Sequence, residues 1–373
     1  MNFQAQNALY HAWQARSNTG PNGKAILVAP RLPVLHKAVL NACDGLDGLT
    51  DGLISDPLAC RFDLADVLCS AGTQDTVGCL SAAEVDVVRK LYAGPRDSAT
   101  GQRLIVAGPQ YGSELGWAGV YVPAAADQPI FSAMIALQAL RHVVFETNPP
   151  AVFSLTDVNF DQAIFERLRP LHPLYDATNP NLSAFAAVGG KLILWHGWAD
   201  PHISPVNTIA YHTALVALMG NERTQAFERL YLFPGMYHCS GGEGPSQVDL
   251  LTAILNWVER GVAPDAVITG QPERTAANDF GVPIGPVNGA KDGPPKASAE
   301  RRPAADSDSN AASRPAAIAR SRPVYPYPSI ASYDGRGDPK QAVSFVRGAA
   351  RVGFAMPDWA GKDFYRPYLP RER

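Results

Sequence analysis

The sequence predicts an α/β fold, in which short parallel strands alternate with helices, and three observations support this prediction. Residues 191–195 and 230–234 are apolar runs with the length and composition of buried parallel strands. Residues 205–219 lie between them and are typical of a helix, with Pro at the start and Gly220 directly after the end. Each apolar run is followed at once by a turn that carries a side chain of a type used in catalysis. We therefore expect both turns at one edge of a parallel sheet.

The first helices are predicted from apolar spacing and capping residues. Residues 1–16 place several apolar side chains on one face, and residues 35–43 form a second helical run. Residues 81–92 have an amphipathic pattern that begins with Ser81 and Glu84, which have the spacing of a capping box.

The last predicted helix of the core begins at Ser246, with Asp249 three residues on, and ends at Gly261. Residues 271–319 are rich in Pro, Ala, Ser and charged side chains and have few large apolar ones. A segment of that composition buries too little apolar surface to fold, so we predict that it is flexible.

Asp200 follows the first apolar run, and His238 follows the second. This is the chain order of the acid and the His in α/β-hydrolase triads, where both come after the nucleophilic Ser. A Ser hydroxyl needs a neutral imidazole to take its proton, and the imidazole needs a carboxylate to fix its tautomer. We predict Asp200 as the orienting acid and His238 as the general base. The alternative is an Asp-Pro turn and a loop His without a catalytic role.

The sequences around these residues resemble a known family. His-Gly-Trp-Ala-Asp-Pro at 196–201 and Gly-Met-Tyr-His-Cys-Ser-Gly-Gly-Glu-Gly-Pro at 235–245 are similar to the acid and base motifs of the tannase/feruloyl esterase family. That family contains serine esterases of the α/β-hydrolase fold and includes the mono(hydroxyethyl) terephthalate hydrolase. The resemblance covers about 2–270 and resumes near 320. It implies hydrolysis of esters of aromatic acids, feruloyl, galloyl or similar, through an acyl-enzyme.

The nucleophile half of the family pattern is missing upstream of Asp200. Ser113, in Tyr-Gly-Ser-Glu-Leu-Gly, comes nearest to a Gly-x-Ser-x-Gly motif, and Ser240 lies too close along the chain to His238. Family members carry the nucleophile shortly before a segment that resembles residues 2–8, so we expect this chain to begin after it and to be inactive alone. Two alternatives stay open: a non-catalytic calcium-binding remnant that binds aromatic ligands or a partner, and a different hydrolase whose nucleophile lies elsewhere, such as Ser113.

Three Asp residues, Asp44, Asp47 and Asp51, are separated by Gly in one short loop. Clustered carboxylates repel one another unless a hard cation such as Ca²⁺ neutralises them. The spacing is not that of an EF-hand, but it resembles the calcium loop of the feruloyl esterase lid. The resemblance implies a structural Ca²⁺ bound by these three side chains and by the carbonyls of Leu49 and Leu53. The alternative is an ordinary Asp/Gly turn.

The chain has five cysteines: Cys43, Cys60, Cys69, Cys79 and Cys239. The family resemblance implies the pairs Cys43–Cys60 and Cys69–Cys79, and it leaves Cys239 without the partner that normally precedes the nucleophilic Ser. Disulfides imply an oxidising compartment, so we expect the intact protein to be periplasmic or secreted, although the start of this chain does not have the pattern of a signal peptide. The alternative is five reduced thiols in the cytosol.

The resemblance implies a hydrolase core interrupted by a large inserted lid. The predicted parts are 1–19 (core), 20–185 (lid with the calcium loop), 186–270 (core with acid and base), 271–319 (flexible) and 320–373 (tail packing on the core). Within the lid, Trp117, Tyr121 and Phe131 are either the walls of an aromatic acyl pocket or ordinary lid core.

Composition narrows the class of partner. Of 373 residues, 32 are basic and 35 are acidic, for a net charge of −3, which favours neither nucleic acid nor an anionic membrane surface as a partner. No apolar run in the sequence reaches the length of a membrane-spanning helix. We expect the ligand to be a small aromatic ester.

Overall fold

The protein is described from a computed structural model that covers residues 4–73, 76–272, 318–351 and 354–369. The helices of these residues are α1 (Gln4–Ser17), α2 (Leu32–Cys43), α3 (Ala82–Ala93), α4 (Phe131–His142), α5 (Gln162–Leu168), α6 (His172–Tyr175), α7 (Ser183–Ala187), α8 (Val206–Met219), α9 (Asn221–Gln225) and α10 (Leu250–Arg260). The strands are β1 (Leu192–Gly197), β2 (Glu228–Phe233), β3 (Gln247–Val248), β4 (Val267–Pro272), β5 (Ile318–Val324), β6 (Ala331–Tyr333) and β7 (Phe345–Arg347). The segment predicted to be flexible, 271–319, lies almost wholly outside the described residues.

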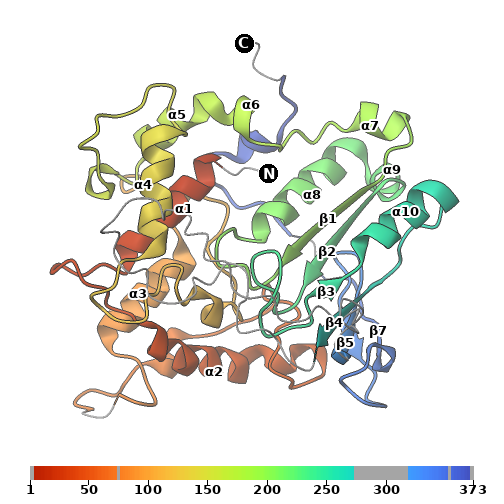
Figure 1. Cartoon of the computed structure of the whole chain (residues 1–373), viewed down its shortest axis with the longest axis horizontal. Coiled ribbons are helices and arrows are strands. Elements are labelled where there is room, and N and C mark those ends of the chain that lie inside the picture. Colours follow the sequence, from red (N-terminus) through yellow and green to blue (C-terminus); the bar gives the residue numbers. More distant parts are fainter. Residues whose placement is uncertain (1–3, 74–75, 273–317, 352–353, 370–373) are drawn as a thin grey trace, which may run out of the picture.

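The predicted strand–helix–strand unit is present. β1 and β2 pair in parallel, from Leu192 opposite Glu228 to Gly197 opposite Phe233. The helix between them is α8, as the sequence predicted. Figure 1 shows α8 and α10 on either side of the two strands. The alternation of strand and helix therefore confirms the α/β class.

The two faces of this sheet pack against different elements. On one face, Tyr231 and Phe233 of β2 cluster with Val267 of β4 and Val324 of β5, and α10 packs against that cluster through Leu250. On the other face, Leu230 and Leu232 cluster with Ile209 of α8 and with Trp198. β2 is thus covered on both faces, as expected of a strand in a parallel sheet.

β1 is less buried than its apolar sequence predicted. Leu192, Ile193 and Leu194 are only half-buried, and Trp195 is 37% exposed. Within the described residues, β1 pairs with β2 alone, so its outer edge is open. An apolar strand with an open edge is an available pairing surface for another strand.

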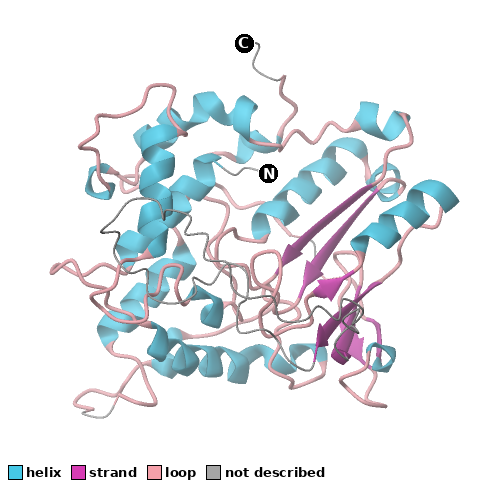
Figure 2. Ribbon diagram, in the orientation of Figure 1, coloured by secondary structure: helices cyan, strands magenta, loops and turns pink. Residues whose placement is uncertain are grey.

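A second, antiparallel sheet has the order β3-β4-β5, and β6 pairs with β7. β5 comes from the C-terminal part of the chain and reaches the core by pairing with β4. Figure 1 and Figure 2 show that the strands gather on one side of the molecule, with α1, α3, α4 and α5 on the other, and that α2 runs along the lower edge toward the strands.

The largest hydrophobic cluster contains α1, which packs against α3 and α4. α1 was predicted to belong to the hydrolase core, and this cluster includes both helices of the predicted lid and α8 of the predicted core. Trp117 and Tyr121 are fully buried there, with ring centroids 5.6 Å apart, so they are core residues. The domain boundaries themselves stay predictions.

The capping predictions had mixed outcomes. The Ser81–Glu84 capping box is present at the start of α3. The last helix does not begin at Ser246: residues 247–248 form β3, and the side chain of Asp249 caps α10 by accepting a hydrogen bond from Thr252 N–H. In the described part of the chain, no helix is long and apolar enough to cross a membrane.

Candidate active site

The turns after β1 and β2 bring Asp200 and His238 together. The two strands are parallel neighbours, so their carboxyl ends lie at one edge of the sheet. His238 Nδ1 lies 2.8 Å from Asp200 Oδ2. The two side chains that the sequence selected as acid and base are therefore in hydrogen-bond contact.

The backbones of the two turns pack directly against each other. Trp198 N–H donates to Phe233 O at 2.9 Å, and Ala199 N–H donates to Met236 O at 3.0 Å. A Cβ on Gly197 would meet Met236 O at 2.2 Å, so only glycine fits between the turns. This close backbone packing fixes the distance between the acid and the imidazole.

Asp200 is 2% exposed and is held from both sides. Its Oδ1 accepts the backbone N–H groups of His202 and Ile203, at 2.8 and 3.0 Å. Burial favours the neutral acid, but the hydrogen bonds from His196 and His238 outweigh it and hold the pKa of Asp200 well below its ordinary value. Asp200 is therefore a carboxylate at neutral pH.

His196 is a site residue that the sequence reasoning did not select. Its Nε2 lies 3.0 Å from Asp200 Oδ2 and 3.1 Å from Ile203 O, and its Nδ1 lies 2.7 Å from Thr208 Oγ1. A neutral ring with the proton on Nε2 satisfies all three contacts, because Nδ1 then accepts the Thr208 hydroxyl. The available signal was its position at the end of the predicted strand, four residues before Asp200.

One ring nitrogen of His238, Nδ1, faces the Asp200 carboxylate. The His238 side chain is 26% exposed, and the hydrogen bond to Asp200 raises its pKa above the ordinary value, against the opposing effect of burial. Because Nδ1 faces Asp200, Nε2 points to the other side of the ring, where a nucleophile would stand in a triad.

Other rings surround this imidazole. The His202 ring centroid lies 5.1 Å from that of His238, and Phe131 lies 6.3 Å from His202. His11, behind His202, is 1% exposed, and burial followed by the charge of His202 lowers its pKa to about 3. Of the three aromatic residues considered for an acyl pocket, Phe131 is the one that contacts a residue of this group.

The structure also places Cys239, Ser113 and the four cysteines predicted to form disulfides. Cys239 is exposed and free, with a left-handed backbone (φ 69°), and burial together with the charge of Asp200 raises the pKa of its thiol. Ser113 is fully buried, and its Oγ donates to Gln110 O and accepts the Trp117 indole N–H. This burial argues against Ser113 as a nucleophile. Both expected disulfides, Cys43–Cys60 and Cys69–Cys79, are present.

The three Asp residues of the predicted calcium loop point at different partners. Asp44 accepts the backbone N–H groups of Asp51 and Leu53, both at 3.2 Å, and of the glycine between them. Asp47 accepts the N–H of Leu49 at 3.1 Å. The two Leu residues predicted as carbonyl ligands therefore present their amides to the carboxylates.

Two arginines of β5 reach the same loop. Asp51 Oδ2 forms ion pairs with Arg320 and Arg322, and Arg322 Nη1 lies 3.8 Å from Asp47 Oδ2. Arg322 is 1% exposed, so its charge is fully buried among these carboxylates. In the part of the chain that the structure describes, no group of three His, Cys, Asp or Glu side chains is arranged to hold a metal ion. In this arrangement the guanidinium groups of Arg320 and Arg322 offset two of the three carboxylate charges of the loop.

The amino-acid sequence is similar to a known family and to several of its members. The family profile "Tannase and feruloyl esterase" matches residues 1–348. An uncharacterized esterase of Xanthomonas campestris is 30% identical over 91% of this chain and 58% of its own length. The mono(2-hydroxyethyl) terephthalate hydrolase of Piscinibacter sakaiensis is 32% identical over 84% of this chain and 51% of its own.

Among solved structures, an esterase from Aspergillus oryzae is similar, with a TM-score of 0.69 and 25% identity over 92% of this chain and 62% of that protein. This likeness supports the α/β-hydrolase type of fold that the sequence predicted. In each case the match spans about half to three fifths of the relative's length.

Proposed function

The chain belongs to the tannase and feruloyl esterase family, and on that basis we propose that it carries the acid and the general base of a serine esterase for esters of aromatic acids. The observation that carries the proposal is the 2.8 Å contact between His238 Nδ1 and Asp200 Oδ2 at the ends of adjacent parallel strands. We propose that the substrates are esters of feruloyl, galloyl or similar acyl groups. Two observations support this class: one relative is named for a terephthalate half-ester, and the ring of Phe131 lies beside that of His202.

In this mechanism His238 does the proton transfers. With Nδ1 held by Asp200, its Nε2 takes the proton of a serine hydroxyl as the oxygen attacks the ester carbonyl. The same nitrogen then protonates the leaving alkoxide and later activates the water that releases the aromatic acid. The lowered pKa of Asp200 and the raised pKa of His238 support these roles, because the carboxylate stays charged and stabilises the imidazolium.

We further propose that the serine is supplied by residues other than those of this chain. The burial of Ser113 supports this, as does the open edge of β1. A strand that paired in parallel with that edge would end beside Asp200 and His238, since carboxyl ends of parallel strands meet at one side of a sheet.

The first test uses the chain as it is. Purified protein is assayed with methyl ferulate and labelled with a fluorophosphonate probe, beside His238→Ala. We expect no turnover above the His238→Ala background and no labelled serine, because loss of a triad nucleophile costs on the order of 10⁶ in kcat. Turnover that His238→Ala abolishes would contradict the external serine and support the esterase.

The second test measures whether ester hydrolysis depends on His238. The chain is joined to the part of the Piscinibacter relative that lies outside the match, and the product is assayed with aromatic esters. We expect hydrolysis that His238→Ala reduces by about 10⁴ or more, while Asp176→Asn, in the separate His172–Asp176 pair, leaves it unchanged. Hydrolysis that survives His238→Ala would refute the proposed roles. Ester binding without any acyl-enzyme would favour the non-catalytic alternative.

We also propose that the loop of Asp44, Asp47 and Asp51 binds a calcium ion. Asp51 Oδ1 is buried without a hydrogen-bond partner, which leaves one carboxylate oxygen suited to a cation. Because Arg320 and Arg322 already offset two of the three carboxylate charges, calcium would have to compete with them for Asp51, and its role would be structural. The two disulfides support a periplasmic or secreted location for the intact protein.

A further inference from the structure

A cavity of about 350 Å³ lies outside the group formed by Asp200 and His238. Three parts of the chain that are distant in sequence frame it: residues 55–61, the ends of the parallel strands, and residues 323–331. The volume is at the lower end of small-molecule sites. It therefore suits a ligand with one ring rather than two.

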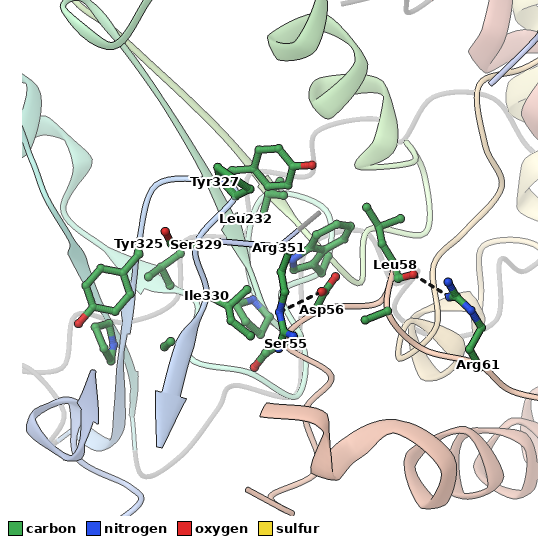
Figure 3. A pocket seen from close by; sticks show the side chains of 17 residues that line it. Ser55, Asp56, Leu58, Arg61, Leu232, Tyr325, Tyr327, Ser329, Ile330 and Arg351 are labelled. Atoms are coloured by element: carbon green, nitrogen blue, oxygen red, sulfur yellow. Dashed lines mark hydrogen bonds and ion pairs between the residues drawn. The ribbon is translucent and has the colours of Figure 1, made fainter. Parts of the chain in front are cut away.

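The walls of the cavity are mainly apolar and aromatic. Trp198, which is 4% exposed, and Leu232 come from the parallel-strand side, and Tyr327 and Ile330 come from the C-terminal part. Figure 3 shows Tyr327 and Leu232 above Ile330. Flat apolar surface of this kind favours an aromatic ring as the bound group.

The charged side chains of the cavity sum to one positive charge. Arg351 Nε lies 3.4 Å from Asp56 Oδ2, and this Nε is buried without a hydrogen bond. Arg61 donates through Nη1 to the carbonyls of Leu58 and Cys60, at 2.8 Å each, and forms no ion pair with the residues that the structure describes. In Figure 3 the Arg351–Asp56 pair lies between Ile330 and Leu58, and Arg61 lies beyond Leu58.

We propose that this cavity binds a small aromatic carboxylate with a single negative charge. The ring packs between Trp198 and Ile330, and the carboxylate is drawn to Arg351 and Arg61. Guanidinium groups are the side chains best suited to a carboxylate, and Arg351 Nε makes no hydrogen bond, although it forms an ion pair with Asp56 at 3.4 Å. Asp56 offsets one of the two positive charges, which favours a monoanion.

This ligand class is the acid product of the proposed esterase, and that identification rests on the proposed function. The site itself rests on the cavity and its charges. Trp198 lies two residues before Asp200 on the same turn, and its N–H is bonded to Phe233 O at 2.9 Å. A ligand in the cavity would therefore contact the turn that carries the acid of the triad.

Calorimetric titration of the full chain with ferulate, and with its uncharged methyl ester, tests the site. We expect submillimolar binding of ferulate and at least tenfold weaker binding of the ester, since the ester lacks the charge that Arg351 and Arg61 attract. Absence of ferulate binding at millimolar concentrations would overturn the proposal. So would equal affinity for acid and ester.

Variants locate the binding. Ile330→Trp fills the cavity and should weaken ferulate at least tenfold, whereas Val343→Trp, at a 91% exposed position of the same part of the chain, should not. Arg351→Gln should weaken it about tenfold, with the exposed Arg89→Gln as its control. His238→Ala should leave binding unchanged. If His238→Ala removes binding and Ile330→Trp does not, the ligand sits at the triad and the proposal is wrong. Since binding needs no turnover, its outcome is independent of the esterase assays.

Discussion

Replacing Asp200 by Asn is the sharpest test of the site in this chain alone. Asn keeps the size of the side chain, and its carbonyl oxygen can still accept the N–H groups of His202 and Ile203. Its amide nitrogen, however, donates at the position where the carboxylate accepted from His196 and His238. The substitution therefore removes the charge and reverses the hydrogen-bond polarity toward both rings.

The expected size of the effect follows from those two contacts. Each ring can accept the amide N–H once its proton moves to the other ring nitrogen, so a neutral hydrogen bond replaces each charge-assisted one. Each such exchange costs about 1 kcal/mol, and two cost about 2 kcal/mol in the free energy of unfolding. For a chain of 373 residues this lowers Tm by about 3 °C. The pKa of His238 should fall below its ordinary value of 6.5, because burial, which lowers it, is then unopposed.

The loss of stability should depend on pH. The raised pKa of His238 adds to the free energy of unfolding; this stabilisation is fully present below pH 6.5 and is lost as the pH rises through the pKa of the folded state. The lowered pKa of Asp200 also adds to the free energy of unfolding; this stabilisation is fully present above pH 3.8 and is lost as the pH falls through the pKa of the folded state. The pair stabilises most between pH 3.8 and 6.5. The difference in Tm should therefore be larger at about pH 5 than at about pH 8.

Two measurements check this reasoning. NMR titration of the His238 ring gives its pKa in wild type and in Asp200→Asn, and thermal unfolding at both pH values gives the stability difference. Asp176→Asn is the matched control, because it breaks a buried Asp–His pair with the same 2.8 Å contact, away from the site. If the His238 pKa is the same with and without the Asp200 carboxylate, the coupling inferred from the geometry does not exist.

Three further predictions concern the rest of the chain. Arg322→Met should lower the free energy of unfolding by about 3 kcal/mol in a denaturant titration, because the buried Asp47 loses its guanidinium partner and Asp51 keeps only Arg320. A change near zero would contradict the buried ion pair. When bound metal is first removed with EGTA, millimolar calcium should raise Tm more in Arg322→Met than in wild type, because the guanidinium group that competes with calcium is gone. If calcium shifts Tm in neither protein, the proposed calcium binding is wrong. Alkylation of the unfolded, unreduced chain should add one label, at Cys239, and five after reduction, by mass spectrometry; more labels before reduction would disprove a disulfide.

The sequence predicted the parts of the fold that local signals determine. The apolar runs, the helix between them and the Ser81–Glu84 capping box all depend on neighbours within a few residues. The meeting of Asp200 and His238 followed from strand order alone, since parallel strands deliver their following turns to one edge. Ser246 failed as a cap because a short strand intervenes and Asp249 satisfies the first amides of the helix.

What could not be predicted depends on contacts between distant segments. The role of His196 depends on the fold of the turn back onto Asp200, which no local pattern encodes. The guanidinium partners of Asp51 come from β5, and the open edge of β1 reflects which strands lie beside it. The cavity around Arg351 is likewise formed by parts of the chain that meet only after folding.

The ion pair between Asp51 and Arg322 joins residues that are 271 positions apart. A ribosome adding about 5–20 residues per second needs roughly 15–55 s to deliver the second residue after the first. During that interval the acidic loop has been synthesised, and the guanidinium groups that will offset its charge have not. The charge of the nascent loop must then be balanced by ions from the surrounding solution, so the ionic composition of the compartment in which the chain folds becomes part of how it folds.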